Sequence, residues 1–451
     1  MKQQEYRGVS LGTILMLLLT AAVIAGFVIV LPQLMGPVDI LLEERAMRSN
    51  TNLNDSLPEL SMNEIPISYA TSAPEATAAP TAEAAQAATP APSPVPTAAP
   101  VVGGSVSLTF GGSICMDTDM RRSGYYEDSK KYDYTENLSL IADELSSDLT
   151  LVTLESITDP AGDVRQIPNA PHEIMDMLKA ANVDVVALGY NRAFERGLSG
   201  AQATVKQAAS RGMETVGLYT SQEDADRIRI ITIDHVNVAV LHYANAVTST
   251  ANRKLSSDNA KYALPVVTIN NGPERIGADI RRARDAGADV VIVSLNWSGV
   301  ESFSTTSTKM NGFMQSLADA GADVIVGSGT KAVRGVKWFM GKREDGTARQ
   351  TLCAWSLGSL INGGRNDGNV TGMLLHLQLS WDGSRVSFES VSYTPTYIWH
   401  FKRDGYSRFR VVASDLPAPD GMDESQSGNA EKAFKRLKET LGNSPVNLRV
   451  K

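Results

Sequence analysis

The sequence has few residues of the kinds that build disulfide frameworks and imidazole-rich metal sites. Only 2 Cys and 5 His occur in 451 residues. This scarcity excludes a disulfide scaffold, and a metal centre would have to depend on carboxylates. There is also no block of Lys and Arg to offset the net charge of -8. The charge balance therefore argues against a nucleic-acid partner.

One long apolar run stands near the start of the chain. Residues 9–35 are almost continuously apolar, which exceeds the roughly 20 residues that a helix needs to span a bilayer. No clear cleavage site follows, so we interpret the run as a single-pass transmembrane signal anchor. A buried core helix or a cleaved secretory signal is the alternative. Because Lys2 and Arg7 precede the run, we expect residues 1–8 in the cytoplasm and the main domain outside, with the bilayer as one partner.

Composition then divides the remaining chain. Residues 36–69 form a juxtamembrane segment, and residues 70–104 are rich in Ala, Pro and Thr, which is typical of a disordered linker. A folded domain is expected at 105–415. In the tail, 416–451, apolar residues recur on one helix face that should dock on the domain, namely Ala430, Ala433, Phe434, Leu437 and Leu441.

The domain has the pattern of an α/β fold with mixed sheets. The apolar run 185–188 ends at Gly189 and precedes a helical pattern at 200–211, as in a buried parallel strand followed by a helix. Segments beginning at Lys179, Asp285 and Asp319 share one plan, in which a helix ends near a small residue and an apolar strand follows. Three further segments alternate like antiparallel strands: 228–241, 373–379 and 385–393. Ligands are expected beyond the carboxyl ends of the parallel strands.

Six segments, taken in chain order, carry a resemblance to a known family. They are 108–113 (LTFGGS), 151–155 (LVTLE), 189–197 (GYNRAFERG), 291–297 (VIVSLNW), 321–331 (GADVIVGSGTK) and 355–359 (WSLGS). In this order they resemble the CapA family of bacterial capsule and poly-gamma-glutamate synthesis proteins, which is similar to calcineurin-like metallophosphoesterases. The resemblance implies a metallophosphatase-like four-layer αββα sandwich with mixed sheets.

The departures from the family pattern concern the metal ligands. Positions that the family fills with Asp or His hold Ser113, Arg192, Asn296, Gly329 and Lys331 here. A pair of divalent ions requires several anionic or imidazole donors, and cationic side chains repel such ions. We therefore expect a degenerate metal site, no cofactor and no hydrolase activity.

Two of the family's polar positions remain, Glu155 and Asn191. Glu155 is the residual catalytic candidate, although it lacks the second carboxylate that glycoside hydrolysis uses, and Asn191 either faces the cleft or caps the next turn. The ligand-binding cleft candidates are Ser113, Glu155, Asn191, Arg192, Asn296 and Lys331. Arg192 and Lys331 either replace the ions and hold a carboxylate or phosphate, or are solvated loop residues.

A rival interpretation rebuilds the metal centre from other residues. Its ligands would be Asp117, Asp119 and His242 together with Glu155, holding Mn, Fe or Zn for phosphoesterase-like or polymer-processing hydrolysis. By resemblance, Cys115 and Cys353 flank segments near the cleft, where a disulfide and two reduced thiols both remain open. The favoured function is synthesis or binding of a capsule polymer, possibly poly-gamma-glutamate, by an extracellular pseudoenzyme. An anionic polymer or an envelope protein complex is the expected partner.

Overall fold

The computed structural model describes residues 103–299, 305–343, 346–366, 368–383 and 385–449. The predicted anchor at 9–35, the segment 36–69 and the linker up to residue 102 lie outside them. Among the helices within these described ranges, none combines the length and the apolar character needed to cross a membrane.

The larger sheet contains nine strands of the described chain, in the order β16-β15-β14-β1-β4-β5-β6, with β13 beside β1 and β17 beside β15. The strands are β1 (Gly104–Ile114), β4 (Leu149–Leu154), β5 (Val185–Ala187), β6 (Glu214–Val216), β13 (Ser359–Ile361), β14 (Thr371–Trp381), β15 (Val386–Arg403), β16 (Tyr406–Ala413) and β17 (Asn447–Leu448). β1, β4, β5 and β6 run parallel, while β14, β15 and β16 are antiparallel. The sheet is therefore mixed, as predicted.

The smaller sheet has the order β11-β12-β10-β9-β8-β7 in the residues described. Its strands are β7 (Arg229–Ile233), β8 (Val236–Ala244), β9 (Val290–Asn296), β10 (Val324–Ser328), β11 (Val336–Lys342) and β12 (Ala348–Ala354). The four inner strands are parallel, and an antiparallel strand closes each edge. A separate short hairpin pairs β2 (Tyr125–Tyr126) with β3 (Lys131–Tyr132).

The helices confirm the repeated helix–strand plan. They are α2 (Thr118–Ser123), α3 (Ile174–Ala180), α4 (Gly197–Ala209), α5 (Gln222–Asp226), α6 (Ser249–Ser257), α7 (Gly272–Asp285), α8 (Thr308–Ala320) and α9 (Glu424–Leu441), with 3₁₀ turns η1 (Thr135–Asn137), η2 (Ser139–Ile141) and η3 (Asp143–Leu145). α3, α7 and α8 precede β5, β9 and β10, respectively. α8 ends at Gly321, whose φ of 106° is a left-handed cap that favours glycine.

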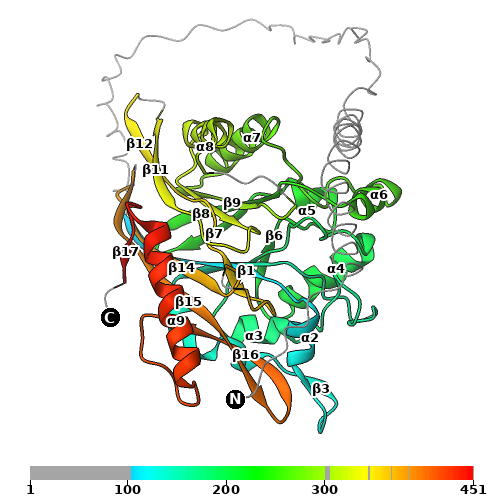
Figure 1. The fold of residues 1–451 in the computed structure, drawn as a ribbon. Helices are drawn as coiled ribbons and strands as arrows, with labels where there is room; N and C mark the ends of the chain where they lie inside the picture. The colour runs from blue at the N-terminus through cyan, green and yellow to red at the C-terminus, as the bar shows by residue number, and fades with distance from the viewer. Residues whose placement is uncertain (1–102, 300–304, 344–345, 367, 384, 450–451) are drawn as a thin grey trace, which may run out of the picture. The chain divides into compact units, whose positions relative to one another are not determined.

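Three apolar clusters define the layers of this unit. One fills the space between the two sheets, a second packs α3 and α4 on the outer face of the larger sheet, and a third packs α7 and α8 on the outer face of the smaller sheet. Figure 1 shows α7 and α8 beyond the smaller sheet and α3 beyond the larger one. The order of layers is helices, larger sheet, smaller sheet, helices.

The last helix, α9, packs on β14 and β15. A capping box between Asp423 and Gln426 starts it, which satisfies free N–H groups of its first turn. Ala433, Leu437 and Leu441 are buried on its inner face. The predicted docking stripe is confirmed, although Phe434 is only partly buried.

Candidate functional site

Side chains alternate between the two faces of each strand. On the faces that form the core between the sheets, the residues at the carboxyl ends of the strands are polar, and they form a site there. On β9, Val290 and Ile292 face the core between the sheets, so Asn296 points to the same side two residues beyond Ser294. The same alternation carries Ser328 on β10 and Glu155 after β4 into this space. We call this group, together with Ser113, Asn191 and Lys331, the strand-end site.

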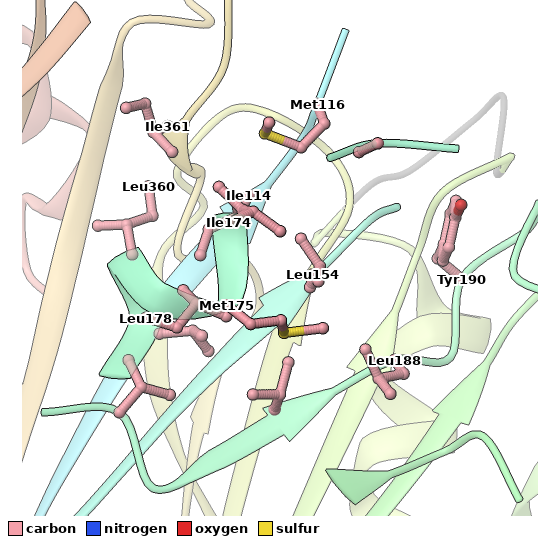
Figure 2. Packing of buried hydrophobic residues seen from close by; sticks show 14 of the residues in the cluster. Ile114, Met116, Leu154, Ile174, Met175, Leu178, Leu188, Tyr190, Leu360 and Ile361 are labelled. Atoms are coloured by element: carbon pink, nitrogen blue, oxygen red, sulfur yellow. The ribbon is translucent and has the colours of Figure 1, made fainter. Parts of the chain in front are cut away.

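A β-bulge brings Ser113 into the strand-end site. The register of β1 against β4 shifts between Phe110 and Ser113. Phe110 belongs to the core between the sheets, whereas Ile114 packs in the cluster on the helix side. Figure 2 shows Ile114 beside Ile174 in that cluster. Ser113 therefore points between the sheets. A Cβ at Gly112 would lie 2.1 Å from the carbonyl oxygen of Gly358, so the bulge requires glycine there.

Asn296 joins the two sheets within the site. Its Nδ2 donates to Glu155 Oε1 at 2.9 Å and to Ser328 Oγ at 3.3 Å. Its Oδ1 accepts from the backbone N–H of Ser298 at 2.9 Å and from the Ser298 hydroxyl. Because Asn296 is fully buried and its hydrogen-bonding capacity is in use, it positions Glu155 and leaves the ligand to other groups.

Glu155 is a carboxyl held in a poorly solvated position. Burial raises its pKa, and the hydrogen bond from Asn296 and the positive charge of Lys331 oppose this shift only in part. Its backbone N–H donates to the carbonyl of Ile114 at 2.8 Å, which fixes it beside β1.

Arg192 and Lys331, the two cationic residues predicted at the site, differ in whether a carboxylate of the protein already pairs with them. Arg192 forms a two-pronged ion pair with Glu195, with Nε–Oε1 and Nη2–Oε2 distances of 3.0 and 2.8 Å, and Thr248 donates to the same carboxylate at 2.8 Å. A ligand at Arg192 would therefore have to compete with Glu195 for this guanidinium. Lys331 is exposed, lies close enough to influence Glu155, and forms no ion pair with any described residue.

Two buried hydroxyls at the site have no hydrogen-bond partner among the described residues, Ser113 Oγ and Tyr190 Oη. Figure 2 shows the Tyr190 hydroxyl at the edge of the apolar cluster, pointing away from it. Burial raises the pKa of Tyr190 well above its usual value, and Cys115 and Glu155 add to the shift. An unmet buried hydroxyl costs about 1–3 kcal/mol, so both hydroxyls are positions for a ligand group or a water.

Asn191 belongs to this donor set. Its backbone N–H donates to Ser298 Oγ at 3.1 Å, and its carbonyl accepts from the N–H of Thr248 at 2.9 Å. Within the described ranges its side-chain amide has no partner, so it does not cap the turn. Sequence reasoning named Asn191 and Ser113 but missed Ser298 and Ser328. The alternation of β10 could have indicated Ser328.

His242 lies between the sheets, and both of its ring nitrogens are in hydrogen bonds. Its Nε2 donates to the carbonyl of Gly189 at 2.7 Å, and its Nδ1 accepts from Ser294 Oγ at 2.8 Å. A carbonyl can only accept, so Nε2 carries a proton, and the lowered pKa of the buried ring leaves Nδ1 unprotonated at neutral pH. Burial lowers the pKa of His242 to about 4. A Cβ at Gly217 would lie 2.2 Å from the ring, so the imidazole is also fixed by packing.

The other residues of the rebuilt metal centre have structural contacts. Asp117 caps α2 by accepting from the N–H of Met120 at 3.0 Å, and its second oxygen accepts from the N–H of Gly363 at 2.9 Å. Asp119 is half exposed, 3.8 Å from Arg365. In the part of the chain that the structure describes, no three His, Cys, Asp or Glu residues lie together as a metal-binding group. The rival ligand set is therefore not assembled.

Both cysteines lie in described residues, and both are free thiols. Cys353 packs in the apolar cluster beneath α7 and α8, whereas Cys115 follows β1 in the other sheet. The disulfide alternative is wrong, because the two side chains belong to different layers. Burial raises the pKa of Cys115 to about 12, with Glu155 and Asp117 adding to the shift.

Comparison with known proteins places these features in a family. A family model described as "Bacterial capsule synthesis protein PGA_cap" matches residues 107–364. The chain is 25% identical over 162 residues to the capsule biosynthesis protein CapA of Bacillus anthracis, covering 35% of this chain and 37% of that protein. It is 25% identical over 252 residues to the PGA biosynthesis protein CapA of Bacillus subtilis (strain 168), covering 55% and 56%. Each match therefore spans less than two thirds of the relative's own length.

A solved structure, the calcineurin-like phosphoesterase YfkN from Bacillus subtilis, aligns with 75% of this chain and 99% of its own. The identity is 15% and the TM-score 0.36, values too low to support an argument about activity.

Proposed function

This chain belongs to the family of bacterial capsule synthesis proteins described as PGA_cap, and on that premise we propose that it binds an anionic capsule polymer at the strand-end site. In this proposal residues 9–35 anchor the protein in the cell membrane, and the described domain faces the outside. The polymer is an acidic one such as poly-gamma-glutamate, which the name of the Bacillus subtilis relative suggests. The site does not hydrolyse the polymer with metal ions.

The observation that carries this proposal is the exposed ammonium group of Lys331, which lies near Glu155 and forms no ion pair with any described residue. The amide of Asn191 and the unpartnered hydroxyls of Ser113 and Tyr190 complete the set. Such a set, one cation with neutral hydrogen-bonding groups, suits the carboxylates and amides of an acidic polymer.

The donors do not fit the dinuclear metal centre that the calcineurin-like resemblance implies. Asn296 presents N–H to Glu155, because its single oxygen accepts twice from Ser298. A metal ion requires oxygen from this amide. Lys331 adds a repulsive charge at the same place. We derive no catalytic step through metal ions for this site.

Titration of the full-length protein with oligo-gamma-glutamate tests the proposal. Lys331→Ala should weaken binding about tenfold, because a charge-assisted contact contributes about 1.5–3 kcal/mol. Lys206→Ala removes an exposed lysine from α4 and is the matched control. Unchanged affinity in Lys331→Ala, or an equal loss in Lys206→Ala, would contradict the proposal.

The alternative function is hydrolysis at a rebuilt centre, and the raised pKa of Glu155 favours it, because catalytic acids have such values. Elemental analysis of the purified protein distinguishes the two. Stoichiometric Mn, Fe or Zn, with phosphodiesterase activity that Glu155→Gln abolishes, would replace the binding proposal. For the location, protease added to intact cells should cleave the described domain, and full protection would contradict the outward orientation.

A further inference from the structure

A second concave site lies beside α2 and the β2–β3 hairpin, outside the strand-end site. It is a cavity of 330 Å³, lined by Tyr125, Tyr132, Tyr406, Arg121, Arg122 and Arg165. We call it the tyrosine–arginine pocket. None of the described residues that line it is a carboxylate. In a chain with a net charge of -8, a pocket lined by cations and aromatic rings is a local reversal of charge.

Three tyrosine rings and their hydroxyls line the pocket, and Tyr132 also stacks on Tyr134 with centroids 6.3 Å apart. Tyr125 and Tyr132 meet with ring centroids 5.2 Å apart and an angle of 57°, so they form adjoining walls. Tyr406 is 45% exposed at the β15–β16 turn. Within the described ranges, none of the three hydroxyls has a hydrogen-bond partner. Rings with free hydroxyls suit a ligand that has both apolar faces and a polar rim.

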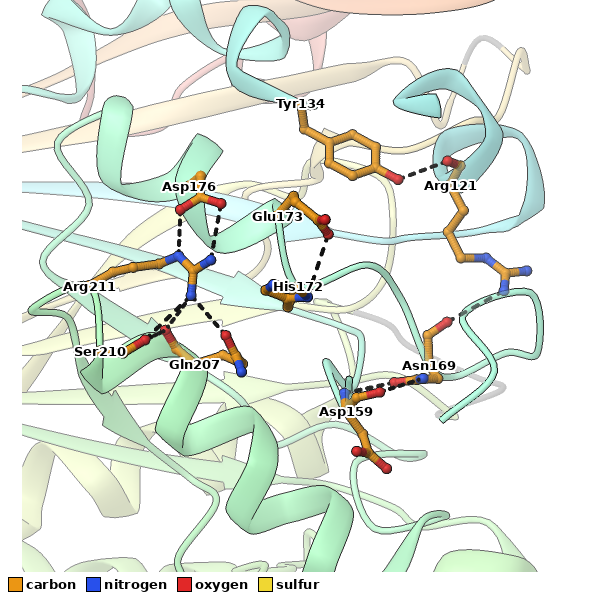
Figure 3. Close-up of polar contacts among 10 residues, drawn as sticks. All are labelled: Arg121, Tyr134, Asp159, Asn169, His172, Glu173, Asp176, Gln207, Ser210 and Arg211. Carbon is orange, nitrogen blue, oxygen red and sulfur yellow. Dashed lines mark hydrogen bonds and ion pairs between the residues drawn. The ribbon is translucent and has the colours of Figure 1, made fainter. Parts of the chain in front are cut away.

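Arg121 supplies positive charge without a matching carboxylate. Arg121 is only 5% exposed, and its guanidinium donates to the carbonyls of Asp117, Val164 and Asn169 and to a hydroxyl. Figure 3 shows its contact with Asn169. In the described chain it forms no ion pair, although a buried charge is costly unless a counter-ion compensates it.

The other two arginines differ from Arg121. Arg122 is exposed, and its guanidinium has no partner among the described residues. Arg165 pairs with Asp163 outside the pocket, with an Nε–Oδ1 distance of 3.0 Å. The uncompensated charge of the pocket therefore comes from Arg121 and Arg122. Both residues line the pocket.

From these observations we propose that the tyrosine–arginine pocket binds an acidic sugar unit of a polysaccharide. The ring of the sugar lies against the tyrosines, its hydroxyls bond the phenol groups, and its carboxylate meets Arg121 and Arg122. The cavity is at the small end of the range for ligand pockets, about 300–1,000 Å³, so it fits a single unit of a chain. A flexible acidic peptide supplies the carboxylate but no ring for the three tyrosines.

Binding of a galacturonic acid trimer to the full-length protein tests this inference. The trimer should bind, and the same trimer with its carboxyl groups reduced to alcohols should bind about tenfold more weakly or not at all. Arg122→Ala and Tyr406→Ala should each weaken binding severalfold. Both side chains are exposed, and thermal unfolding would verify that the variants fold. Arg253→Ala removes an exposed arginine from α6 and should have no effect.

Three outcomes would overturn the inference. They are absence of trimer binding, an equal loss in Arg253→Ala, and binding of a glutamate trimer as tight as that of the sugar and unaffected by Tyr406→Ala. The last would identify an acidic peptide as the ligand. Lys331→Ala should leave sugar binding unchanged, because Lys331 does not line this pocket. Failure of the inference is therefore distinct from failure of the proposed function.

Discussion

Acidification should destabilise the folded domain through His242, because this imidazole is buried between the sheets in its neutral form. Burial lowers its folded-state pKa from 6.5 to about 4. Above pH 6.5 the ring is neutral in the folded and unfolded states alike. Below that, the unfolded chain binds a proton that the folded chain excludes, so stability falls until the pH reaches the folded pKa. At 1.36 kcal/mol per pKa unit, the total loss is about 3 kcal/mol.

Urea unfolding of the full-length protein between pH 7 and pH 4 measures this loss. His376 also has its pKa lowered to about 4 by burial, so the wild-type slope alone does not isolate His242. His242→Gln keeps a hydrogen-bonding side chain without the titration. This variant should start less stable at pH 7, but its free energy of unfolding should change by up to about 3 kcal/mol less across the range.

The control for this comparison is a variant that is destabilised without losing a titrating group. Leu255 is 6% exposed on the buried face of α6, and Leu255→Ala should cost about 2–5 kcal/mol while keeping the wild-type dependence on pH. If His242→Gln and the wild type show the same slope, the imidazole is not the neutral buried group described above.

Four further measurements address the strand-end site and the thiols. Glu155→Gln should raise the free energy of unfolding at neutral pH, more so as the pH increases, because burial penalises the ionised carboxylate; a loss would contradict this. Asn296→Ala should cost about 2–4 kcal/mol in urea unfolding, since it leaves the buried partners of the amide unsatisfied; a neutral result would refute its role between the sheets. Without reductant, both cysteines should react with a maleimide in urea but react slowly in the native protein, because both are free and largely buried; two unreactive cysteines in urea would indicate a disulfide. Arg192→Ala should change polymer affinity by less than about twofold, because Glu195 already holds this guanidinium; a loss as large as that of Lys331→Ala would mean that the pair opens.

Local pattern predicted the elements that position the site. The helix–strand segments and the alternating strands are where the sequence placed them, because buried parallel strands require continuous apolar runs. Family resemblance placed Ser113, Glu155 and Asn296 together, and their shared face follows from the alternation of β4 and β9 and from the bulge in β1.

What the sequence did not reveal depends on contacts between distant segments. The burial of His242 depends on Gly189 and Gly217 of the other sheet. The partner of Arg192 is only three residues away, but nothing in the spacing shows which group its fork meets. The tyrosine–arginine pocket combines α2, β3 and the β15–β16 turn, and no local spacing indicates it.

The bond between Asn296 and Glu155 also has a mechanical meaning, because the first residue belongs to the smaller sheet and the second to the larger one. Tension along the proposed polymer, bound at this point, would act on the contact between the two sheets and not on a single loop. The apolar core between the sheets would resist this force. Substitutions that weaken the core should therefore lower the affinity for the polymer, even where every side chain that contacts the polymer is unchanged.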